Sequence, residues 1–293
     1  MRRDRSHRRG VILMLCAGLL WSIAGVFTRH VEQAGRWEIA YWRSFFCVIA
    51  MLAILLVQHR RNAPRVVAGL GRVGLLSGAL WAVMFTCFML ALTQTTTANT
   101  LILTSISPLT ASLFAWLLIG ERIAARTWGL IALALGGIAI MFGGELGGGK
   151  LAGNFIALLV PLAAGLNFTL LRKSGARVDL IPAVLLGGTL SALATLWLAL
   201  PFQASARDLA ILALLGTFQL ALPCSLAVAA ARHLTAAEVA LIGLSENLFG
   251  PLWAWLGAGE TPSRQAMLGG ALVLTALLIE ILARGSARQR AST

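Results

Sequence analysis

The sequence predicts an all-α integral membrane protein, with ten transmembrane helices arranged as two inverted five-helix repeats. Three observations lead to this prediction: the composition, the length of the apolar blocks, and a motif that occurs twice. Of the 293 residues, 58% are hydrophobic and 12% are charged, whereas soluble chains are about 45–50% apolar and about 25% charged. We therefore expect most of the chain to lie in lipid.

The apolar residues fall into ten blocks of about 20 residues, which is the length that a helix needs to cross the hydrocarbon core. Helices are expected because they satisfy their own backbone in lipid, and because the blocks lack the alternation of barrel strands. The predicted spans are 11–28, 38–57, 72–92, 95–118, 125–143, 152–171, 181–200, 208–230, 235–257 and 264–283. The connections between them are short, so no soluble domain is expected.

One motif occurs in both halves of the chain. The segment 113–121, LFAWLLIGE, is followed 139 residues later by 252–260, LWAWLGAGE. Five spans per half is an odd number, so the second half enters the membrane upside down. We predict a first repeat at 1–145 and a second repeat at 146–293. Inverted repeats are typical of secondary transporters, whose substrate site lies between the halves.

Positive charge indicates the orientation. If the amino terminus and alternate loops are cytoplasmic, they hold eighteen of the 24 Lys and Arg, and the other loops hold five. Cytoplasmic loops are enriched in Lys and Arg, so both termini are predicted to be cytoplasmic. The net charge of +13 then indicates contact with anionic membrane lipid rather than with nucleic acid.

The pattern of reactive residues does not favour catalysis or metal binding. Cys16, Cys47, Cys87 and Cys224 lie singly in four spans, and all four histidines lie at or beyond span ends. We expect no metal site, no cofactor and no disulfide. The sequence shows no nucleophile–base pair, HExxH helix or Walker A sequence, and no filter segment of a channel. A membrane enzyme and a channel are therefore the less favoured alternatives.

The surroundings of the repeated motif resemble a known family. Ser107-Pro108 precedes an apolar run to Gly120-Glu121, and Thr127-Trp128-Gly129 opens the next span. This pattern resembles the EamA family of the drug/metabolite transporter superfamily. The second copy runs from Glu246-Asn247 through Gly259-Glu260 to Gly269, with Asn247 where the family usually has Pro and one extra residue before Gly269. Glu121 and Glu260 lie at membrane boundaries, where we expect them to fix loops rather than to touch substrate.

The resemblance implies a secondary transporter that works by alternating access in the bacterial inner membrane. The chain looks most like bacterial amino-acid exporters, including the aromatic amino-acid exporter type. The implied substrates are amino acids, aromatic and other neutral ones included, or similar small metabolites. The alternatives are an exporter of other metabolites or drugs, and a membrane enzyme without transport activity. Which substrate is moved, and whether protons drive it, stays open.

The resemblance also implies a cavity lined by spans 1, 3, 4, 6, 8 and 9, with spans 5 and 10 at the periphery. The family pattern places four polar or amphipathic residues on lining spans: Trp21, Asn99, Ser107 and Asn167. Asn99 is close to the outer end of span 4, where capping the helix is its alternative role.

Prolines occur inside four spans and are expected helix breaks: Pro108, Pro161, Pro223 and Pro251. Each proline frees the carbonyl four residues earlier, and three of the freed carbonyls belong to the polar residues Thr104, Gln219 and Asn247. Interrupted helices form polar sites at membrane depth, so these three residues are candidates for the cavity. The alternative is that the prolines only bend the bundle and the freed carbonyls are satisfied locally.

In span 3, Gly74, Gly78, Trp81 and Phe85 share one helical face. The glycines allow close helix packing, and Trp81 and Phe85 are candidates for the wall of an outward-opening vestibule. A packing stripe with lipid-facing rings is the alternative.

Glu246 lies near the middle of span 9, where an ionised carboxylate costs about 2.5–3.5 kcal/mol to insert. It is a candidate for binding a substrate ammonium or for coupling to protons; the alternative is a neutral Glu bonded to a neighbouring helix.

Arg43, early in span 2, can reach the outer interface or pair with Glu38, and its other predicted role is binding a substrate carboxylate.

Small residues in spans 5 and 10 favour tight helix contacts, either within the fold or in a homodimer: Gly129, Ala132, Gly136, Gly137, Gly269 and Gly270.

Overall fold

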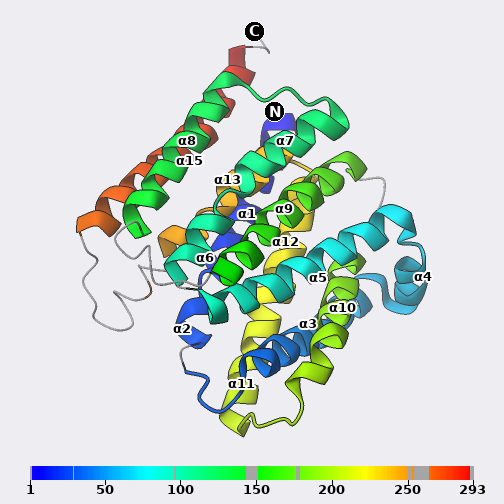
Figure 1. Cartoon of the computed structure of the whole chain (residues 1–293). Helices are drawn as coiled ribbons and strands as arrows, with labels where there is room; N and C mark the ends of the chain where they lie inside the picture. The colour runs from blue at the N-terminus through cyan, green and yellow to red at the C-terminus, as the bar shows by residue number, and fades with distance from the viewer. Residues whose placement is uncertain are drawn as a thin grey trace.

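The computed structural model describes residues 2–28, 30–95, 97–142, 151–175, 179–249, 253 and 264–290. All regular structure in these ranges is helical (Figure 1). By length and composition, seven helical segments of this described part can cross a membrane, and two shorter apolar helices cover Ala125–Ile140 and Met267–Ile279. The prediction of an all-α membrane protein is confirmed.

The helices of the first half follow the predicted spans. Span 1 is α1 with α2, span 4 is α6 with α7, and η1 and α4 lie in the connection between spans 2 and 3. The bounds are α1 Arg2–Trp21, α2 Ala24–Thr28, α3 Arg36–His59, η1 Arg60–Asn62, α4 Ala63–Ala68, α5 Gly71–Gln94, α6 Thr97–Thr104, α7 Ser107–Ile119 and α8 Ala125–Phe142.

The second half begins with two uninterrupted helices and continues with two irregular spans. Span 8 contains a π-helical segment, η3, between α11 and α12, and span 9 is described only as far as residue 249 and at Trp253. The bounds are α9 Leu151–Ser174, α10 Ile181–Ala199, α11 Ala206–Leu214, η3 Leu215–Ala221, α12 Leu222–Ala231, α13 Ala236–Gly243 and α15 Arg264–Arg290.

The packing of the helices has the symmetry that two repeats predict. Helix α3 packs on α10, α7 on α13 and α8 on α15, so spans 2, 4 and 5 meet their counterparts from the other half, spans 7, 9 and 10. The contacts of spans 1 and 6 come in pairs related by exchange of the two halves: α1 packs on α12 as α9 packs on α5, and α1 packs on α13 as α9 packs on α7. A two-fold relation between the halves accounts for this pattern.

Spans 4 and 9 are both broken in their middle, at equivalent places. Helix α6 runs from Thr97 to Thr104 and α13 from Ala236 to Gly243, so both ends are 139 residues apart, the offset of the repeated motif. A two-residue turn follows each helix, and a new helical stretch begins at Ser107 in one half and at Glu246 in the other. The break is therefore a property of the repeat, and in the second half it occurs where Asn247 replaces the proline.

Helices α8 and α15 lie side by side at one edge of the bundle (Figure 1). A Cβ built on Gly137 of α8 would lie 2.7 Å from the carbonyl oxygen of Gly269 of α15, so a side chain there would push the two backbones apart. These two glycines serve contacts within the fold. A Cβ on Gly129 or Gly136 would meet nothing within 4 Å, and a homodimer through that face stays a prediction.

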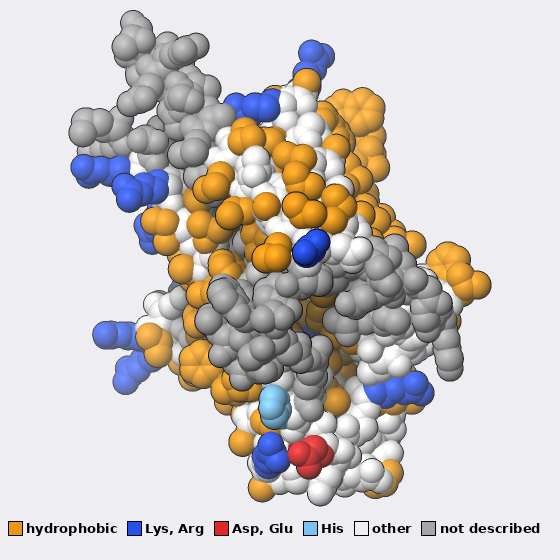
Figure 2. Space-filling view, turned by 90° about the vertical axis from the view of Figure 1, so that its left-hand side faces the viewer, with side chains coloured by type: hydrophobic (Ala, Val, Ile, Leu, Met, Phe, Trp, Pro, Cys, Tyr) orange, Lys and Arg blue, Asp and Glu red, His pale blue; other side chains and the backbone are white. Residues whose placement is uncertain are grey.

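The surface matches a protein surrounded by lipid. Figure 2 shows hydrophobic side chains over much of the described part of the face it presents. The exposed apolar residues include large ones, such as Trp197 of α10 and Phe155 of α9, which are 79% and 68% exposed. Lipid tails cover such side chains without the cost that water would impose.

Candidate functional site

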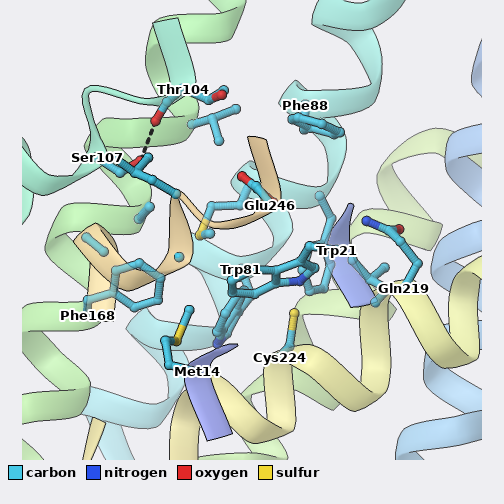
Figure 3. A pocket seen from close by; sticks show the side chains of 18 of the residues that line it. Met14, Trp21, Trp81, Phe88, Thr104, Ser107, Phe168, Gln219, Cys224 and Glu246 are labelled. Atoms are coloured by element: carbon cyan, nitrogen blue, oxygen red, sulfur yellow. Dashed lines mark hydrogen bonds between the residues drawn. The ribbon is translucent and has the colours of Figure 1, made fainter. Parts of the chain in front are cut away.

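A cavity lies among the helices of the two halves (Figure 3). The empty space between its lining side chains amounts to about 760 Å³, including the part that opens to solvent. Its walls come from spans 1, 3, 4, 6, 8 and 9, as expected, and from span 2 through Arg43. None of the described side chains of α8, α10 and α15 lines this cavity.

Seven of the candidate residues line the cavity: Trp21, Trp81, Phe85, Thr104, Ser107, Gln219 and Glu246. They come from five spans, and Figure 3 shows the side chains of those that it labels around a common space. The structure thus brings together residues that are more than 200 positions apart in the chain.

Two candidate asparagines point elsewhere and connect helices. Asn167 of α9 is fully buried and its Oδ1 accepts a hydrogen bond of 2.6 Å from Ser77 Oγ of α5. Asn247 donates from Nδ2 to Ser105 Oγ at 3.2 Å, so it joins the broken parts of spans 9 and 4. The side chain of Asn99 and all of Pro251 lie outside the described residues.

The prolines differ in their effect on the helices. Pro108 lies in the first turn of α7, after the break, and the Thr104 carbonyl that it frees accepts a hydrogen bond from Ser107 Oγ. That carbonyl is therefore satisfied locally, in agreement with the alternative interpretation. Helix α9 continues through Pro161 without a break. Pro223 lies in the first turn of α12, directly after the π-helical segment that carries Gln219.

Aromatic rings form much of the cavity wall. Trp81 and Phe85 are buried, with ring centroids 5.5 Å apart, and Phe168 of α9 lies 6.4 Å from Trp81. Trp21 and Phe88 complete this set. The indole N–H of Trp81 has no hydrogen-bond partner in the described structure. On the same face of α5, Gly78 packs against Leu186 of α10. The glycine therefore serves helix packing, whereas Trp81 and Phe85 line the cavity.

Several lining residues were not among the candidates, including Met14, Met84, Phe88, Phe168 and Cys224. A signal was present for two of the aromatic ones. Phe88 continues the helical face of Trp81 and Phe85 by one more turn, and Phe168 lies on one face of α9 with Val160 and Ala164 at intervals of four residues. The methionines and Cys224 had no signal that distinguishes them from packing residues.

The structure excludes two of the roles that we predicted for Arg43, which were reaching the outer interface and pairing with Glu38. Arg43 is 2% exposed, so it does not reach the outer interface. It does not pair with Glu38 either, because the Glu38 carboxylate accepts hydrogen bonds from the backbone N–H groups of Gln203 and Ala204. The Arg43 guanidinium donates to Gln219 Oε1 at 3.3 Å and to the Phe85 carbonyl at 3.1 Å. Burial against α5 and η3 directs it to the cavity.

The Glu246 side chain lines the cavity from the first residue after the break in span 9. Within the described part of the chain, no hydrogen bond or ion pair of its carboxylate is found. The alternative of a Glu bonded to a neighbouring helix is therefore not what the described residues show. Figure 3 shows the Glu246 carboxylate directed into the space between the aromatic rings and Thr104.

The two broken spans are accompanied by equivalent contacts at opposite ends of the bundle. At one end, His7 of α1 contacts Glu238 of α13 at 2.9 Å, and Ser6 Oγ lies 2.8 Å from His233 Nδ1. Burial lowers the pKa of His233, and the neighbouring Arg9 and Arg232 lower it further.

At the other end of the bundle, the first turn of α9 makes the contact that is equivalent to that of α1. Thr95 Oγ1, in the turn between α5 and α6, donates to Asn154 Oδ1 of α9 at 2.6 Å. Each half of the chain thus contacts the amino-terminal end of the first span of the other half.

The motif residue Glu121 lies beside Arg172 at the end of α9, with 3.7 Å between Oε1 and Nη2, which agrees with a role in fixing the loop after α7. Glu260 lies outside the described residues. No group of three or more His, Cys, Asp or Glu side chains that could hold a metal is found in the part of the chain that was described.

Comparison with known proteins gives a family match over most of the chain. The EamA-like transporter family matches residues 8–143 and 151–282. The two matched segments fall in the two predicted repeats, whose boundary at 145/146 lies between them, outside the described residues, and stays a prediction.

Two relatives and one solved structure extend this match. The pseudopaline exporter CntI of Pseudomonas aeruginosa is 25% identical over 276 residues, which are 92% of this chain and 95% of the exporter. Human solute carrier family 35 member G1 is 25% identical over 183 residues, 58% of this chain and 49% of the carrier. A solved structure described as "Crystal structure of protein" has a TM-score of 0.76 at 17% identity and covers 92% of this chain and 97% of its own, which shows the same fold.

Proposed function

Because the chain belongs to the EamA-like transporter family, we propose that it exports amino acids, aromatic and other neutral ones included, or similar small metabolites. The observation that carries this proposal is the cavity between the two repeats, in which aromatic rings and a few polar groups line one space. Concave sites with mainly apolar walls and few polar groups are typical of small-molecule binding.

The symmetry of the fold supports alternating access as the mechanism. The packing of α1 on α12 and α13 is equivalent to the packing of α9 on α5 and α7, at opposite ends of the bundle. Opening one set of contacts while the other stays closed exposes the cavity to one side at a time. The breaks in spans 4 and 9, held together by Asn247 and Ser105, lie beside the cavity, where such a change reaches the substrate.

The lining residues divide into two roles. Trp81, Phe85 and the neighbouring rings pack against the apolar part of a substrate. Glu246 binds a substrate ammonium or exchanges a proton during the cycle, since an isolated carboxylate at membrane depth is costly and is typical of transport pathways.

The charge distribution supports the orientation, and the likeness to a bacterial exporter supports the location. We assign both termini to the cytoplasm, because eighteen of the 24 Lys and Arg lie in the segments on that side. The membrane is the inner membrane of a bacterium, and the substrate leaves the cytoplasm.

An exporter of other small metabolites is the second candidate, since the relative CntI is named as an exporter of pseudopaline. A membrane enzyme is less favoured, because the described residues that line the cavity include one carboxylate, Glu246, and no histidine.

The purified protein in liposomes tests the proposal. We expect counterflow of at least one of the twenty amino acids above that of empty liposomes, and a pH gradient distinguishes coupled from facilitated transport. Lack of counterflow for all twenty, with a folded protein, would reject amino acids as substrates. The lipid-facing Trp197→Ala variant is the control for nonspecific effects of losing an indole, because Trp197 is 79% exposed and outside the cavity.

A further inference from the structure

Arg43 is a buried cation with no anionic partner among the residues that the structure describes. Its side chain lies in a membrane-spanning helix and is 2% exposed. None of the carboxylates that the structure describes forms an ion pair with it. Charged groups inside membrane spans are costly and normally pair with one another or face a site of function.

The neighbours of Arg43 orient the guanidinium but do not neutralise it. Nη1 donates to Gln219 Oε1 and Nη2 to the Phe85 carbonyl, both of which are uncharged acceptors. Nε is buried and has no partner in the described structure. Since a guanidinium has five N–H donors, the two recorded bonds leave N–H groups for a further acceptor on the cavity side.

Glu246 is the complementary group in the same cavity. It comes from span 9, whereas Arg43 comes from span 2, and both line the one space. No ion pair joins them. If the two charges served only stability, direct pairing would be the favourable arrangement. A molecule that carries both opposite charges, bound in this cavity, would give each of the two groups a partner.

We propose that the cavity is a zwitterion site, in which Arg43 binds the carboxylate of an α-amino acid and Glu246 binds its ammonium group. This inference rests on the proposed function and names its substrate class. The guanidinium is suited to a carboxylate because its parallel N–H groups can form two charge-assisted hydrogen bonds. The rings of Trp81, Phe85 and Phe168 then receive the amino-acid side chain.

Selectivity is the consequence that can be measured. An amine without the carboxylate leaves Arg43 buried and unpaired, and an acid without the ammonium leaves Glu246 unpaired. Sites built for a polar group reject analogues that lack it, because their own buried groups stay unsatisfied.

The experiment uses the full chain in liposomes and three probes with the same apolar group: phenylalanine, phenethylamine and 3-phenylpropionate. We expect the wild type to prefer phenylalanine over both analogues by on the order of 10- to 100-fold. Arg43→Gln should reduce phenylalanine transport by a similar factor without reducing phenethylamine transport, because the amine no longer leaves a buried cation unpaired. Glu246→Gln should reduce phenylalanine transport without reducing 3-phenylpropionate transport, because the acid no longer leaves a buried carboxylate unpaired. Arg207→Gln is the control, because the Arg207 side chain is 63% exposed and lies outside the cavity.

The outcomes separate this inference from the proposed function. Transport of either analogue as fast as phenylalanine by the wild type would overturn the zwitterion site and leave the exporter intact. Equal losses for all probes in Arg43→Gln would reduce Arg43 to a structural residue. If the Gln variant does not fold, Arg43→Lys decides: the inference requires that the preference for phenylalanine over phenethylamine persists, and equal transport of both overturns it. No transport of any probe by the folded wild type would count against the proposed function for aromatic amino acids.

Discussion

Replacing Trp81 by phenylalanine removes one hydrogen-bond donor from the cavity wall and keeps an aromatic ring there. Trp81 is 1% exposed, and its indole N–H has no partner in the described structure. The variant therefore breaks no hydrogen bond that the described structure contains. We expect it to fold, and to lose affinity for substrate if the N–H donates to the bound molecule.

The magnitudes differ for stability and for transport. An unsatisfied buried donor costs about 1–3 kcal/mol, and its removal offsets the loss of a few ring atoms from the packing with Phe85 and Phe168, which costs about 0.8 kcal/mol for each CH₂ equivalent. The melting temperature should therefore change little. A hydrogen bond to the substrate contributes about 0.5–1.5 kcal/mol, which corresponds to roughly a 2- to 12-fold increase in KM at 1.4 kcal/mol per tenfold change.

The assay is concentration-dependent counterflow in liposomes, together with a thermal melt of the purified protein. Trp197→Phe is the matched control, since this tryptophan is 79% exposed on α10 and should change neither quantity. A Trp81→Phe variant with unchanged KM would refute the reasoning that the free N–H is there for the substrate. A large loss of thermal stability would show that the main role of the Trp81 indole is to stabilise the fold rather than to bind substrate.

Three further predictions follow from the fold and the cavity. Alanine at Trp81 or Phe85 should weaken transport and leave expression and folding largely intact; loss of folded protein without a selective transport defect would favour the packing stripe. A cysteine introduced at position 147, outside the described residues, should be labelled from outside the cell, and one at position 62 only from inside; the reverse would overturn the topology. Glu246→Gln should impair transport and Glu246→Asp should impair it less, measured as initial rates across a pH series; wild-type rates and pH dependence in the Gln variant would make Glu246 a packing residue.

The helices could be predicted because length and hydropathy determine them locally. A block of about 20 apolar residues has one low-energy form in lipid, so the predicted span 72–92 and the observed α5, Gly71–Gln94, differ by a residue or two at each end. The repeat was visible because its motif is short and rich in tryptophan. The break at Leu244 and Ser245 was not placed there, because no proline marks it and the apolar run continues across it.

The targets of the polar side chains could not be predicted, because they depend on which helices become neighbours. Asn167 is directed to Ser77 by the packing of α9 on α5, and the residue beside it, Phe168, faces the cavity instead. Arg43 has Glu38 within reach along its own helix, yet loop amides occupy that carboxylate. Periodicity identifies a face of a helix, but the partner of that face is decided by tertiary packing.

Ser107 and Glu246 occupy the same place in the two repeats, each as the first helical residue after the break. The scaffold around them is related by a two-fold axis, but a hydroxyl stands in one half where a carboxylate stands in the other. A bound molecule therefore has one preferred orientation, although the movement that releases it has two equivalent ends. Either half can change its side chain at this place and keep the turn that precedes it. In a duplicated protein of this kind, substrate preference can diverge over generations while the transport cycle is inherited unchanged.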